Sequence, residues 1–144
     1  MTTSIIRVSP IVLAALFAGT ASSAEPAVIM SGPHANEEFC KIMVRQVELG
    51  GEYMKLDPMN PDKAKRAKYF NDQKELNAKL AKSAPASIAS DAARFSKEAN
   101  DLYDAQLAGT AGDPARIKAA TGPMRSPEHL AASKRMSAYC GAKL

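Results

Sequence analysis

The stretch SAPASIASDAARFSKEANDLYDAQLAG, residues 83–109, carries the strongest periodic pattern in the chain. Its inward-facing positions recur in alternating steps of four and three residues, which is the spacing of one face of an α-helix. Ser83 and Pro85 at the start and Gly109 at the end are typical helix boundaries. The pattern therefore predicts a long amphipathic helix whose buried face consists of Ile88, Ala92, Phe95, Ala99, Leu102 and Gln106.

Cap and breaker residues predict further helical stretches on both sides. Asn36 and Asp57-Pro58 bound a helix over 36–57, and Asn60-Pro61 starts one over 60–83. A short helical segment over 113–121 follows, and Ser126-Pro127 starts a last helix that ends at Cys140. No segment alternates with period two, so no sheet is expected. Four main helices with short connections predict an all-α, up-down-up-down four-helix bundle domain over 36–144.

Residues 1–24 have the pattern of a secretory signal peptide. Arg7 precedes an apolar run over 11–18, and small residues before Glu25 predict cleavage there. A transmembrane anchor is the alternative, but the apolar stretch is short, contains Pro10 and has no basic flank on its far side. We therefore expect no anchor, an irregular lead-in over 25–35, and a protein that is periplasmic or secreted.

The predicted export determines how the two cysteines, Cys40 and Cys140, are interpreted. In an oxidising compartment an even cysteine count indicates a disulfide, and these two residues allow a single intramolecular pairing. The first turns of the first helix and the last turn of the last helix meet at one end of an up-down bundle, which agrees with a bridge. Two buried free thiols are the alternative.

Composition limits the classes of function. The chain has 144 residues, of which 46% are apolar and 24% are charged, as in one ordinary globular domain. Its net charge of +4 falls to +3 when the signal peptide leaves with Arg7, so nucleic acid is not an expected partner. No nucleophile elbow, phosphate loop or paired-histidine metal motif occurs. We therefore predict a non-catalytic protein without a cofactor.

Several turn and cap features resemble a loose class of small exported bacterial helical-bundle proteins with one end-to-end disulfide. The features are Phe39-Cys40, Asp57-Pro58 with Asn60-Pro61, Ala84-Pro85 with Ile88, and Tyr139-Cys140-Gly141. Most members of that class have no known function, so the resemblance implies a fold and no activity. The mycobacterial secreted haem carrier is similar in being a small, exported helical protein, but no haem-binding motif aligns with positions of this chain.

One surface is a candidate for binding. Lys63, Lys65, Arg66 and Lys68 crowd the first two turns of the helix over 60–83. In an exported protein such a patch can contact an anionic surface or an envelope protein. A solvated helix face, partly neutralised by neighbouring acids, is the alternative.

Two interior sites are also possible. Tyr53, Met54 and His129 are expected at the bundle end opposite the cysteines and could ligate haem iron, although Tyr53 and Met54 fit equally well as core. An enzyme of the exported helical chorismate-mutase type would need cations such as Arg45 and Lys74 to converge in a cleft.

The methionines are a further candidate site, because thioethers bind Cu(I). Met30, Met54, Met59 and Met124 form no close-spaced repeat, however, so gap filling and surface exposure explain them.

The sequence thus predicts an exported, non-catalytic helical-bundle protein of the cell envelope that binds an unidentified ligand or partner. A haem carrier and a small exported enzyme are the alternatives.

Overall fold

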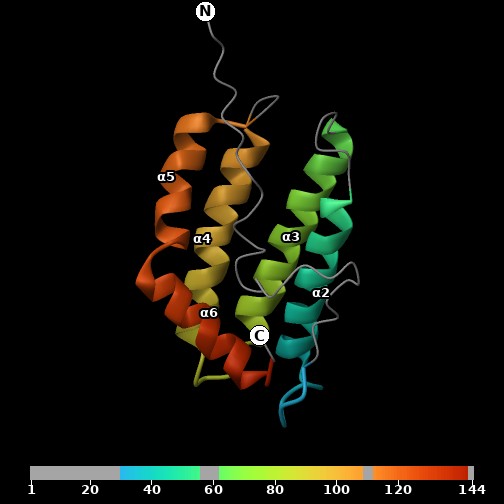
Figure 1. The fold of residues 1–144 in the computed structure, drawn as a ribbon, viewed down its shortest axis with the longest axis vertical. Helices are drawn as coiled ribbons and strands as arrows, with labels where there is room; N and C mark the ends of the chain where they lie inside the picture. Colours follow the sequence, from blue (N-terminus) through green and yellow to red (C-terminus); the bar gives the residue numbers. More distant parts are fainter. Residues whose placement is uncertain (1–29, 56–61, 109–111, 143–144) are drawn as a thin grey trace, which may run out of the picture.

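A computed structural model describes residues 30–55, 62–108 and 112–142, and five α-helices occupy most of this part of the chain (Figure 1). They are α2 (Glu38–Met54), α3 (Lys63–Ser83), α4 (Ala89–Leu107), α5 (Pro114–Met124) and α6 (Pro127–Tyr139). Within the described residues the only β-type pairing is an isolated bridge between Met30 and Ala142. The prediction of an all-α chain is confirmed for these residues. The predicted signal peptide and cleavage point lie outside them.

None of the described helices has the length and apolar character needed to cross a membrane.

The helix starts correct three of the predicted caps. Glu37, not Asn36, is the residue before α2. The carboxylate of Asp62 accepts from the first backbone N–H groups of α3, while Asn60 lies outside the described residues. Ala84 is extended and ends α3, because a proline disfavours helical geometry at the residue before it. A turn closed by the hydrogen bond from Ile88 to Pro85 follows, so α4 begins at Ala89 and not at the predicted Ser83-Pro85 signal. The caps predicted for α5 and α6, Asp113 and Ser126, are confirmed.

Each helix packs against the helix that follows it in the chain. α3 lies against α2 and α4, and α4 also packs against both α5 and α6. In Figure 1, α5 and α6 follow one another along α4, so two short helices share the place of a fourth long one. The predicted bundle has four main helices, whereas α5 is nearly as long as α6 and counts as a fifth. The four-helix up-down topology therefore stays a prediction.

Two apolar clusters fill the interior. One surrounds the cysteines and contains Phe39, Ile42, Leu80, Ile88, Ala92, Phe95 and Met136. The other lies towards the far end of the bundle and contains Leu49, Tyr69, Phe70, Ala99, Leu102, Tyr103 and Met124. The positions predicted to face inward on α4, from Ile88 to Leu102, are all 8% exposed or less.

A buried polar layer links α2, α3 and α4. Asn77 accepts a hydrogen bond from Gln46 at 2.6 Å and donates one to Asn100 at 2.8 Å. Gln73 donates to the backbone oxygen of Gln46, and Ser96 donates to that of Asn77. These bonds satisfy groups whose burial would otherwise cost free energy, and they bind the three helices in one register.

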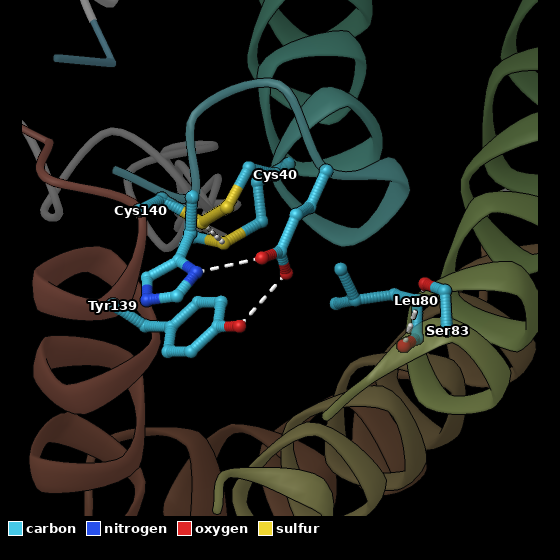
Figure 2. The surroundings of a disulfide bond; sticks show 8 residues. Cys40, Leu80, Ser83, Tyr139 and Cys140 are labelled. Atoms are coloured by element: carbon cyan, nitrogen blue, oxygen red, sulfur yellow. Dashed lines mark hydrogen bonds and ion pairs between the residues drawn. A yellow bond between two sulfur atoms is a disulfide. The ribbon is translucent and has the colours of Figure 1, made fainter. Parts of the chain in front are cut away.

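The Cys40–Cys140 disulfide joins the start of α2 to the end of α6 (Figure 2), with Cα atoms 5.6 Å apart. The predicted pairing is therefore present at disulfide geometry. Backbone hydrogen bonds from Ser31 to Gly141 and from Gly32 to Cys140 hold the lead-in against the same end of α6.

Candidate functional site

Only some of the basic side chains at the start of α3 are available for contact with another molecule. Lys68 pairs with Asp72 at 2.5 Å. Arg66 is half-buried, donates to the backbone oxygen of Gln106, and lies 5.9 Å from the ring centre of Phe70. Its guanidinium therefore fastens α3 to α4. Among the predicted surface residues, Lys63 and Lys65 are exposed and form no ion pair with a described residue.

Further cations lie at the same end of the molecule. α3 begins, α4 ends and α5 begins there, as Figure 1 shows. Arg116 and Lys118, in the first turns of α5, are exposed and likewise have no ion-pair partner in the described part of the chain. We call Lys63, Lys65, Arg116 and Lys118 the basic end. Arg116 and Lys118 were missed because they are distant in sequence from the patch on α3.

The acids nearest the basic end are engaged elsewhere. Asp62 caps α3, and Asp113 caps α5. Asp72 pairs with Lys68, and Asp104 pairs with Lys74. The four cations are exposed and form no ion pair with a described residue, so they are accessible to an anionic partner.

The structure does not bring the three haem-ligand candidates together. The ring of Tyr53 stacks on Tyr69, with centroids 4.0 Å apart, and Met54 is 56% exposed. His129 is buried beside Phe95 in the first half of α4, not at the Tyr53 end as expected. The physical reason is that α5 occupies the place beside the last turns of α4, so α6 begins part-way along the bundle.

Burial also opposes ligation by the tyrosines of this cluster. It raises the pKa of Tyr69 to about 12, and it raises the pKa of Tyr53 and of Tyr103 above the ordinary value. A phenolate, the form that binds iron, is therefore disfavoured at neutral pH. These rings act as core.

The two cations of the enzyme alternative do not converge. Arg45 pairs with Glu48 and Glu52 on its own helix, at 3.3 and 3.0 Å. Lys74 pairs with Asp104 of α4. A surface hollow of about 150 Å³ between α2 and α3 is lined by Arg45 but not by Lys74.

His129 makes a close pair with Glu98 that sequence reasoning missed. The two groups approach to 2.5 Å, and their side chains are 6% and 15% exposed. Since nothing in local sequence indicates which turn of α4 faces α6, this pair could not be read from the pattern. No cluster of three or more His, Cys, Asp or Glu residues suited to a metal ion occurs among the described residues.

A second unpredicted cluster lies beside the disulfide. Glu37 accepts hydrogen bonds from His34 at 2.6 Å and from Tyr139 at 2.7 Å, and the rings of His34 and Tyr139 stack with centroids 4.1 Å apart (Figure 2). These hydrogen bonds lower the pKa of Glu37. The cluster joins the lead-in and the start of α2 to the end of α6.

A small cavity of about 40 Å³ lies inside the bundle. Ser133 is 1% exposed there, and its hydroxyl has no hydrogen-bond partner in the described structure. The lining comes from the lead-in and from four helices: Met30, Met43, Gln46, Val47, Leu80, Phe95, Tyr103, Ser133, Met136 and Ser137. Three of these residues are methionines.

Comparisons with protein families, with curated proteins and with solved structures found no match for this chain.

Proposed function

We propose that the chain is an exported, non-catalytic binding protein of the cell envelope, of the small helical-bundle class described above, and that its basic end binds anionic lipid headgroups. The observation that supports the proposal is the group of four exposed cations at one end of the bundle, whose neighbouring acids serve as caps or form other pairs. Lysine and arginine near an anionic membrane each contribute about 1 kcal/mol to binding.

The arrangement suits a planar partner better than a cleft-bound ligand. The cations come from the first turns of α3 and α5, which begin at the same end of the bundle (Figure 1). Arg66 and Lys68 take part in contacts within the bundle, so Lys63 and Lys65 are the residues of the predicted patch to test.

Vesicle co-sedimentation tests this proposal. The protein beginning at Glu25, with its disulfide formed, should bind vesicles rich in phosphatidylglycerol and should be released by salt, because surface charges are screened. The Lys63→Gln/Lys65→Gln variant should bind about thirty-fold more weakly, since each lysine contributes about 1 kcal/mol.

A matched variant removes the same charge from the other end. Lys41, near the start of α2, and Lys82, near the end of α3, are both exposed. Lys41→Gln/Lys82→Gln should leave vesicle binding close to that of the unmodified protein. Equal weakening by both double variants, or none by either, would remove the basic end from the proposal.

A further inference from the structure

Three methionines from separate parts of the chain line the interior cavity. Met30 belongs to the lead-in, Met43 to α2 and Met136 to α6, and all three also pack in the apolar cluster around the disulfide. We propose that Met30, Met43 and Met136 form a binding site for a soft monovalent metal ion, with Cu(I) as the natural candidate. This inference is independent of the basic end.

The disulfide accounts for the position of the three methionines around one cavity. Met43 follows Cys40 by three residues, and Met136 precedes Cys140 by four, so each methionine lies one helical turn from a cysteine on the same face. The Sδ atom of Met43 lies 3.8 Å from Sγ of Cys140. Met30 reaches the same place because it forms a β-bridge with Ala142.

The chemistry of the lining selects the ion. Thioethers are neutral, soft ligands that favour Cu(I) over hard or divalent cations. No Asp, Glu, Lys or Arg lines the cavity, so the described lining offers a divalent ion no compensating charge. Both cysteines are held in the disulfide, so thioethers are the soft sulfur ligands left to this chain.

The cavity also has an unmet hydrogen-bonding group. The buried hydroxyl of Ser133 lacks a partner among the described residues, and such groups are rare unless water or a ligand completes them. Three methionines and this hydroxyl thus line one space of about 40 Å³, which has room for a single small occupant.

Methionine-methyl NMR tests the site. The disulfide-bonded protein, labelled with ¹³C at the methionine methyl groups, is titrated with Ag(I) nitrate in chloride-free buffer. Ag(I) is a redox-inert substitute for Cu(I). The resonances of Met30, Met43 and Met136 should shift together and saturate with a single ion, while those of exposed Met54 and of Met124, buried in the other cluster, should stay in place.

Substitution adds a second measurement. Met43→Leu/Met136→Leu keeps the apolar volume but removes two thioethers, and it should abolish saturable Ag(I) binding measured by calorimetry. Met54→Leu should bind Ag(I) as the unmodified protein does. Uniform or absent methyl shifts in the unmodified protein, or undiminished binding by the double variant, would overturn the proposal. The methyl spectrum decides the matter even if the double variant fails to fold.

Discussion

At the scale of single residues, the most specific polar contact between α4 and α6 is the pair formed by Asp91 and Arg135. The guanidinium donates two hydrogen bonds of 2.7 Å to the two carboxylate oxygens. Asp91 is 11% exposed at its side chain, whereas Arg135 is 58% exposed. The hydrogen bonds from Arg135 lower the pKa of Asp91. A two-point contact of this kind fixes orientation better than a single ion pair.

Asp91→Asn should destabilise the fold by roughly 1 kcal/mol at pH 7, between the values for exposed and buried pairs. Because the folded-state pKa is depressed, this stabilisation is complete above the unfolded pKa and is lost as pH falls through the folded value. Urea unfolding should therefore show a constant difference between the two proteins near neutrality, which shrinks below about pH 4.

Lys97→Gln is the control for that series. Lys97 and Asp101 lie one turn apart on α4 and form an ion pair at 2.7 Å, and both side chains are exposed. Its loss should change stability less than Asp91→Asn does, because a fully exposed ion pair is screened by water and salt. A difference for Asp91→Asn that persists unchanged at low pH would contradict the role given to the ion pair.

At the scale of the elements, Gly141 determines how α6 ends and how the lead-in attaches. Its φ of +65° is in the left-handed region that favours glycine. A Cβ atom at this position would also collide with the backbone of Gly32. The last helix was predicted to end at Cys140, and α6 ends one residue earlier, at Tyr139. Gly141 provides the left-handed turn after it and allows the close approach of the lead-in.

Gly141→Ala should detach the lead-in without unfolding the helices. Amide hydrogen exchange should speed up at Ser31 and Gly32, whose N–H groups donate to residues 141 and 140. The amides of α3 and α4 should keep their protection. Gly51→Ala is the control, because nothing lies within 4 Å of a Cβ built at Gly51. Unchanged exchange at residues 31 and 32 in Gly141→Ala would contradict this account.

Local patterns predicted elements better than contacts between them. The inward face of α4 followed from its spacing, because helical periodicity depends on neighbouring residues only. The start of that helix was predicted too early, since Ser83 and Ala84 end α3 and α4 begins only at Ala89. The positions of His129 and of the His34–Glu37–Tyr139 cluster depend on how helices distant in sequence pack, which spacing does not determine.

At the scale of the whole molecule, the disulfide organises both ends of the described chain. It closes a loop of 100 residues, which in the chain-entropy model stabilises a fold by about 4–5 kcal/mol. It also brings α2, α6 and the lead-in to one place, where the methionine-lined cavity lies, while the basic end lies at the opposite end of the bundle (Figure 1). The molecule thus has two candidate sites that can be tested separately.

We propose that the protein is exported, processed and closed by this disulfide before it binds a partner. The most direct test is native mass spectrometry of the full chain expressed in bacteria and recovered from the envelope and medium. Export and oxidation together predict the mass of a chain that begins at Glu25, lighter by the hydrogens lost in forming one disulfide. An uncleaved chain, or a cleaved chain with both thiols free, would contradict it.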